Sequence, residues 1–189
     1  MAFDLEKQQS FNLTVEVPTL NNVFVGLGWD ESDGTVQELD ADVSVFMLGV
    51  DHKIPADPYF VFYNNLTSAD GSVVHQGDNR TGEGDGDDEC ININLSKVNP
   101  AIQQMMFVVT IHDAAARRQD FSHLKNSFIR ICDNASGNEL CRFTLNDDFV
   151  GCDSVQIGRL YRSGDEWGFE AMGDAFQGGL STLLGLYVN

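Results

Sequence analysis

Ten short apolar segments, rich in Val, Ile and Phe, constrain the fold of this chain more than any other feature. Several alternate apolar and polar residues with a period of two, as the run Ile91–Leu95 does. This period predicts β-strands with one buried face. The segments are Phe11–Val15, Asn22–Leu27, Val43–Leu48, Tyr59–Tyr63, Ile91–Leu95, Met106–Ile111, Ser127–Cys132, Glu139–Leu145, Val155–Tyr161 and Trp167–Met172.

Clusters of Gly, Asp and Asn separate these segments at intervals typical of a sandwich. Asp133–Asn138 and Ser163–Asp165 are expected to be hairpin turns. Helix is scarce, with candidates only at Asn99–Met105, Asp113–Leu124 and Asp174–Leu186. A length of 189 residues suits one domain. The sequence therefore predicts a single domain over residues 1–189, mainly β, built as a two-sheet β-sandwich with a few short helices.

The charge balance is strongly acidic and excludes two classes of partner. The formal net charge is −18, and residues 1–89 alone hold 18 acids against three bases. A nucleic-acid binder or a protein that docks on an anionic membrane needs a basic footprint, which this chain lacks. Of the 29 acids, 20 are Asp, the short carboxylate of turns and hard-cation sites. This composition favours a protein that binds divalent cations.

Neither targeting signals nor cysteine spacing indicates secretion, membrane insertion or a zinc site. The start has no basic and apolar leader, and no apolar run approaches the length of a membrane-spanning helix. None of the four cysteines forms a C-x-x-C pair. We expect a cytoplasmic protein with reduced thiols. Cys132 and Cys141 could face each other across a hairpin and sense oxidants, or be inert core residues.

The segment Gly77–Glu89 carries six acids, one base and four glycines in thirteen residues. Like charges this close repel by roughly 1 kcal/mol per 4 Å pair even in water. Either the segment is a solvated acidic surface, or a cation neutralises it. Glycines let the backbone aim carbonyls inward, and Asp and Asn supply short oxygen donors, which are the ligands of calcium. Because the segment holds no His or Cys, zinc, copper and nickel are disfavoured.

This segment is not an EF-hand, although Asp78 and Glu89 have the spacing of the first and last ligands of one. The third position is Arg80, and the sixth is Glu83 where an EF-hand needs glycine. The segments on either side are predicted strands rather than helices.

Two other acidic stretches lie at the ends of predicted strands. Asp40 and Asp42 lead into Val43–Leu48 and share one face at strand spacing, and Asp30 follows Asn22–Leu27. Paired carboxylates on a strand are destabilising unless something binds them. If these stretches converge on Gly77–Glu89, one end of the sandwich becomes a cup of carboxylates.

These motifs together resemble the TerD-type tellurite-resistance proteins, and the resemblance covers essentially the whole chain. The residues that carry it are Gly26–Asp30, Asp40–Phe46, Phe60–Asn65, Ser68–Val73, Gly77–Glu89, Val109–Ala114, Leu160–Arg162, Glu166–Trp167 and Gly178–Leu180.

The resemblance implies a β-sandwich that binds calcium, two ions being expected, and takes part without catalysis in tellurite resistance and the stress response. It implies partners among other tellurite-resistance proteins, including a membrane-bound complex at the inner membrane. The side-chain ligands carried over are Asp30, Asp40, Asp42, Asp78, Asn79, Asp85, Asp87, Asp88 and Glu89. Backbone carbonyls of Arg80, Thr81 or Gly82 are expected to contribute.

Other readings of these residues remain open. The clustered aspartates could serve a divalent-metal-dependent phosphohydrolase, since two metals are a usual arrangement for phosphoryl transfer. A small-ligand binder is a third possibility. His112 and Asp113 could form an acid–base pair or bind a metal, but a satisfied structural histidine and a helix-capping Asp are favoured.

Overall fold

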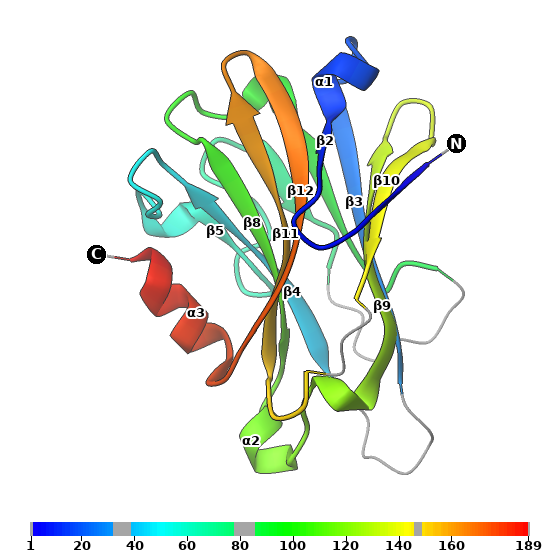
Figure 1. Cartoon of the computed structure of the whole chain (residues 1–189). Helices are drawn as coiled ribbons and strands as arrows, with labels where there is room; N and C mark the ends of the chain where they lie inside the picture. The colour runs from blue at the N-terminus through cyan, green and yellow to red at the C-terminus, as the bar shows by residue number, and fades with distance from the viewer. Residues whose placement is uncertain (1, 32–38, 78–85, 146–148, 189) are drawn as a thin grey trace.

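Two six-stranded sheets pack face to face in this computed structural model, which describes residues 2–31, 39–77, 86–145 and 149–188 (Figure 1). The first sheet has the order β1-β10-β9-β3-β7-β6. Its strands are β1 (Phe3–Leu5), β10 (Glu139–Thr144), β9 (Leu124–Asp133), β3 (Asn22–Glu31), β7 (Glu89–Asn94) and β6 (Val73–His75). The predicted two-sheet β-sandwich is confirmed.

The second sheet has the order β2-β12-β11-β8-β4-β5. Its strands are β2 (Ser10–Asn12), β12 (Glu166–Phe176), β11 (Ser154–Ser163), β8 (Gln104–Ile111), β4 (Ala41–Leu48) and β5 (Phe60–Val61). All strand pairs are antiparallel except β1 with β10. Both predicted hairpin turns are present, because Asp133–Asn138 joins β9 to β10 and Ser163–Asp165 joins β11 to β12.

Short helices and turns complete the fold. They are α1 (Leu13–Glu16), α2 (Ala114–Arg117) and α3 (Gly179–Tyr187), with the 3-10 turns η1 (Asp57–Tyr59), η2 (Leu95–Lys97) and η3 (Phe121–His123). None of the helices within the described ranges has the length and apolar character needed to cross a membrane.

The main core lies between the sheets, and a smaller one lies between the second sheet and α3. In β4, Val43, Val45 and Met47 belong to the main core, whereas Phe46 and Leu48 pack in the smaller cluster with Leu183 of α3. Figure 1 shows α3 against the side of this sheet that faces away from the other sheet. Because both faces of β4 are covered, all eight of its residues are buried.

The first of the three helix predictions was wrong, and the other two were wrong in extent. Asn99–Met105 forms a turn held by the Asp70 carboxylate, which accepts the Asn99 N–H at 2.8 Å, and β8 then begins at Gln104. Asp113–Leu124 is divided because Asp113 and Arg118 adopt left-handed backbone conformations. These conformations interrupt a right-handed helix.

The third helix prediction began too early. Asp174–Phe176 pairs with β11 and extends β12. A positive φ of 105° at Gly178 then turns the chain, and α3 begins at Gly179.

The buried face of β4 leads to a test of the main core. Val45→Ala removes two carbons from a side chain with 0% exposure, whereas Val50→Ala does the same at 80% exposure. We expect Val45→Ala to lower the free energy of unfolding by about 2–3 kcal/mol through lost burial and the cavity left behind. The control should change it by less than about 0.5 kcal/mol. Urea denaturation of both variants measures the difference, and equal effects would contradict this assignment of the core.

Candidate functional site

One end of the sandwich holds the six predicted carboxylate ligands that lie within the described residues. The register pairs Leu27 with Glu89 in the first sheet and Ala41 with Ile111 in the second. The Glu89 carboxylate, on β7, accepts the backbone N–H of Val43, on β4, at 2.7 Å and so joins the two sheets there. We call this the acidic end, and its carboxylates are those of Asp30, Asp40, Asp42, Asp87, Asp88 and Glu89.

Residues 86–89, which form the stem of the acidic segment, lie directly on β3. The N–H of Asp88 donates to the Leu27 carbonyl at 2.7 Å, and the N–H of Trp29 donates to the Asp88 carboxylate at 2.7 Å. Two glycines of β3 make this approach possible. A Cβ at Gly26 would lie 2.3 Å from Asp87 Oδ1, and a Cβ at Gly28 would lie 2.8 Å from the Gly86 carbonyl oxygen.

The Asp87 carboxylate reaches across Gly26 to Arg130 of β9. The guanidinium donates to both carboxylate oxygens, Nε to Oδ1 at 2.8 Å and Nη2 to Oδ2 at 2.6 Å. Arg130 also donates to Glu139 at 3.2 Å, and Glu139 accepts two hydrogen bonds of 2.9 Å from Arg142. Bidentate pairs of this kind are strong and geometrically specific. We call this chain of ion pairs, Asp87–Arg130–Glu139–Arg142, the ladder. It fixes the stem to the outer face of the first sheet.

Glu89 and His75 form a buried clasp at the base of the acidic segment. Both side chains are 1% exposed, and His75 Nε2 lies 3.3 Å from Glu89 Oε2. The other ring nitrogen, Nδ1, accepts the Gly77 N–H at 3.1 Å, so the proton of the neutral ring lies on Nε2 and faces the carboxylate. The clasp therefore joins the residues that precede the acidic segment to the residue that ends it.

Asp30 and Asp88 form an acidic group beside β3. Burial raises the pKa of Asp88, and the charges of Asp30 and Asp87 raise it further, against the lowering effect of its hydrogen bond from Trp29. The exposed Asp30 accepts a hydrogen bond of 2.6 Å from the Asn126 amide. Like charges here oppose ionisation, and a bound cation would relieve that repulsion.

Asp40 and Asp42 lie at the start of β4. The Asp40 backbone carbonyl accepts the His112 N–H at 2.7 Å, but its carboxylate oxygen Oδ1 is buried and has no hydrogen-bond partner among the described residues. Asp42 is 6% exposed, and its Oδ2 lies 4.0 Å from His112 Nδ1.

The described acids share one end of the fold but do not form one cluster among themselves. Asp87 lies on the outer face of the first sheet, Glu89 lies between the sheets, and Asp42 lines a pocket over the second sheet. Within the described ranges, no group of three or more His, Cys, Asp or Glu residues is arranged to hold a metal ion. Six predicted ligands lie outside the described residues, namely Asp78, Asn79, Arg80, Thr81, Gly82 and Asp85.

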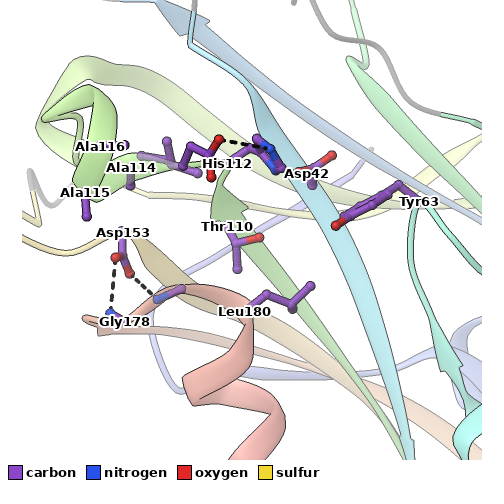
Figure 2. Close-up of a pocket in the computed structure, with 13 residues that line it drawn as sticks. Asp42, Tyr63, Thr110, His112, Ala114, Ala115, Ala116, Asp153, Gly178 and Leu180 are labelled. Atoms are coloured by element: carbon purple, nitrogen blue, oxygen red, sulfur yellow. Dashed lines mark hydrogen bonds and ion pairs between the residues drawn. The ribbon is translucent and has the colours of Figure 1, made fainter.

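The pocket beside Asp42 was not foreseen from the sequence. It encloses about 390 Å³ and brings together β4, β8, α2 and the start of α3 (Figure 2). Tyr63, Thr110 and Asp153 line it, and none of them was a predicted site residue. Nothing in the sequence indicates that Gly178–Leu180 returns to this place, so the pocket depends on the tertiary fold.

His112 also lines this pocket. Its side chain is 42% exposed and lies between two carboxylates, with Nε2 3.5 Å from Asp113 Oδ2. Asp113 occupies the position before α2, but its side chain caps no backbone N–H.

The cysteines are unbridged, and Cys132 and Cys141 do not face each other. A bulge in the β9–β10 pair places Cys132 opposite Glu139 and Cys141 opposite Ile131. Burial raises the pKa of Cys141 to about 12 and also raises that of Cys132. Because the thiolate is the reactive form, these shifts favour inert core thiols.

The contact between Asp87 and β3 generates a first test of the site. Gly26→Ala must displace the Asp87 carboxylate and break its pair with Arg130, so we expect a loss of about 2–3 kcal/mol in the free energy of unfolding. Gly185→Ala is the matched control, because a Cβ there meets nothing within 4 Å and Ala favours the helix. Chemical denaturation that finds Gly26→Ala as stable as the control would refute this packing.

The ladder also predicts a pH dependence. Hydrogen bonds from Arg142 and Arg130 hold the pKa of Glu139 below its ordinary value, against the opposing effect of burial. The ionised Glu139 therefore makes its full contribution to the free energy of unfolding above its pKa in the unfolded chain, about 4.3. That contribution disappears as the pH falls through the pKa of Glu139 in the folded state.

We expect Glu139→Gln to cost about 1 kcal/mol at pH 7, and progressively less below about pH 4.3. The exposed Glu16→Gln is the control. Thermal unfolding between pH 3 and 7 measures both variants. If the stability difference between wild type and Glu139→Gln grew on acidification, the prediction would be contradicted.

Comparisons with known proteins agree with this architecture. The family model described as "TerD domain" matches residues 1–187. Tellurium resistance protein TerD of Serratia marcescens is 44% identical over 187 residues, which cover 99% of this chain and 97% of that protein. General stress protein 16U of Bacillus subtilis (strain 168) is 45% identical over 185 residues, covering 97% and 95% of the two chains.

A solved structure shows the same fold. The crystal structure of a homologue of telluride resistance protein (TerD) from Streptomyces coelicolor A3(2) aligns with a TM-score of 0.69 and 22% identity. The alignment covers 87% of this chain and 95% of that one. By the match of the whole chain and by its identity to these relatives, this protein belongs to the TerD family of tellurium-resistance and stress-response proteins.

Proposed function

We propose that this protein is a non-enzymatic calcium-binding component of the tellurite-resistance and stress response. In this proposal, calcium holds the acidic end in one arrangement and so regulates contacts with partner proteins, other tellurite-resistance proteins and a membrane-bound complex among them. The relatives are named for tellurium resistance and general stress, and those names describe a response rather than a reaction.

The observation that carries the proposal is the buried Asp40 Oδ1, which lacks a hydrogen-bond partner among the described residues. A buried polar atom without a partner costs about 1–3 kcal/mol, and more when it is charged. A cation would supply the missing partner. The donors available at the acidic end are carboxylate and carbonyl oxygens, which fit hard cations such as calcium and magnesium.

Calcium is the better match of the two ions. It accepts six to eight oxygen ligands in flexible geometry, whereas magnesium demands a near-ideal octahedron. A segment with four glycines and six acids in thirteen residues can supply many oxygens but no rigid cage. In the proposal, Asp78, Asn79 and Asp85 add side-chain oxygens, and Arg80 and Gly82 add carbonyls.

The described acids favour two ions rather than one. Asp30 belongs to β3 and Asp88 accepts the N–H of Trp29 in the same strand, whereas Asp40 lies at the start of β4. We assign one ion to each group. Asp87 and Glu89 already have close partners, Arg130 and the Val43 N–H, so they position the stem.

A metal-dependent phosphohydrolase is the second candidate, because the same acids could hold two catalytic metals. It also needs a cation to bind the phosphate. Arg130 lies nearest the stem in the described structure, but Asp87 and Glu139 engage it. Because Arg130 is already paired, the calcium-binding protein is favoured over the phosphohydrolase.

The proposal predicts calcium-dependent stability. Ions that bind only the folded state stabilise chelator-treated protein by about 2.7 kcal/mol at 100 times the dissociation constant. For a chain of this size, that raises the melting temperature by about 5–10 °C. Differential scanning fluorimetry with calcium, and with magnesium in parallel, measures the shift. A melting temperature that does not change in millimolar calcium would refute the proposal.

Asp40→Asn should reduce the calcium-induced shift by at least half, because it removes the charge of the proposed ligand. Asp165→Asn is the matched control, since it also removes one charge but lies in the exposed β11–β12 turn at the opposite end. Equal calcium shifts in the two variants would reject Asp40 as a ligand. Phosphoester hydrolysis with magnesium or manganese that Asp40→Asn abolishes would favour the enzyme instead.

A further inference from the structure

A groove beside the end of α3 is larger than the pocket beside Asp42 and more apolar. It encloses about 760 Å³, against about 390 Å³ for that pocket. One wall is the segment that leads into β5, and the other is the C-terminal part of α3, which Figure 1 shows near each other. We call it the α3 groove, and its apolar lining includes Ile54, Phe60, Phe62, Leu184 and Val188.

Hydrogen bonds join the two walls of the α3 groove. The Ile54 N–H donates to the Tyr187 carbonyl at 2.8 Å. Lys53 Nζ donates to the carbonyls of Leu186 and Val188 at 2.9 and 3.0 Å. Because these contacts fix the walls relative to each other, a ligand would lose little free energy in ordering them.

The edge of β5 is closed to an added strand, and this restricts how a partner can bind. β5 is the outermost strand of the second sheet. The Phe60 N–H donates to the Asp57 carbonyl, and the Phe60 carbonyl accepts the Asn65 amide at 2.7 Å. Phe62 and Asn65 then exchange two backbone hydrogen bonds of 3.0 and 2.9 Å. Because these backbone groups are already paired, a partner must bind through side chains rather than by extending the sheet.

Apolar side chains remain exposed at the α3 groove. Leu186 is 47% exposed and Val188 is 41% exposed. The rings of Phe60 and Phe62 stack with 4.4 Å between their centroids and add aromatic surface. α3 itself contains no charged residue. Contiguous apolar surface of this kind marks interaction sites.

Charge decides between the possible occupants of the α3 groove. Asp57 is the one charged residue that lines it within the described ranges, and the exposed Asp51 lies shortly before this lining in the sequence. Lys53 is directed to the carbonyls at the end of α3. The whole chain carries a formal net charge of −18. A second copy of the chain would therefore be repelled, whereas a partner with Lys or Arg beside its apolar residues would be attracted.

We propose that the α3 groove docks a basic amphipathic helix of a partner protein. The apolar face of that helix lies between the two walls, and its Lys or Arg residues lie beside Asp57. A helix in a groove binds through side chains at i, i+3, i+4 and i+7, which suits an edge that cannot accept a strand. The inference uses no residue of the acidic end and does not depend on calcium.

The test is an NMR titration of isotope-labelled protein with a synthetic peptide of leucine and lysine. The peptide has about 14 residues, or four helical turns, with the leucines on one helix face. We expect saturable chemical-shift changes at the backbone amides of Ala56, Asn65 and Leu184, which line the groove. A peptide of the same composition with the leucines spread around the helix should bind about tenfold more weakly. No shift changes at the groove, or changes confined to the acidic end, would overturn the proposal.

Two pairs of variants separate the apolar contribution from the charged one. Val188→Ser should weaken peptide binding about fivefold, and Val15→Ser, at an exposed residue of α1, is its matched control. Asp57→Asn should weaken binding about threefold at low salt, and Asp165→Asn, in the β11–β12 turn, is its control. All four positions are exposed, so the variants are expected to fold. Equal affinities within either pair would overturn the proposal.

Sedimentation velocity of the protein alone tests the alternative occupant, a second copy of the chain. We expect a monomer at all protein concentrations, because two chains of the same charge repel each other. Self-association that Val188→Ser abolishes and Val15→Ser retains would assign the α3 groove to a second copy and overturn the proposal.

Discussion

A carboxylate loses hydration when it is placed against an apolar core, and this constraint governs the acidic end of the sandwich. Three of the buried or half-buried acids there have a compensating donor, whereas Asp40 Oδ1 has none among the described residues. Arg130 serves Asp87, the Trp29 N–H serves Asp88, and the Val43 N–H and His75 serve Glu89. Glu89 takes donors from both sheets, so it joins the two layers at this end, whereas Asp87 and Asp88 are held within the first sheet.

The close approach of the stem to β3 depends on the absence of side chains at Gly26 and Gly28. Any side chain at Gly26 would occupy the position of the Asp87 carboxylate, and any side chain at Gly28 would meet both the Phe128 ring and the Gly86 carbonyl. The two glycines alternate with Leu27 and Trp29, whose side chains are buried in the core. One face of β3 therefore seals the core while the other receives the acidic segment.

The acids at this end lie on different faces of the fold. Asp30 and Asp88 lie beside β3 in the first sheet, whereas the pocket beside Asp42 lies over the second sheet, between α2 and the start of α3. Asp42 alternates with Ala41 and Val43, whose side chains belong to the main core. It therefore points away from Glu89, although both residues lie at the same end.

The sequence by itself determined the strands and the acidic end. Period-two runs such as Ile91–Leu95 identify strands because side chains alternate between faces, and strand ends followed by aspartates place the acids at one end. β1 escaped prediction because it has only three residues and no fully buried side chain. The helix predictions overextended because left-handed residues, such as Asp113 and Arg118, are set by the surrounding packing. Only the tertiary structure decided which partner each acid has, since Arg130 lies 43 positions from Asp87 in the sequence. It alone decided that Thr110 and Tyr63 share a pocket with Asp42, because non-local contacts between strands and α3 leave no periodic signal in the chain.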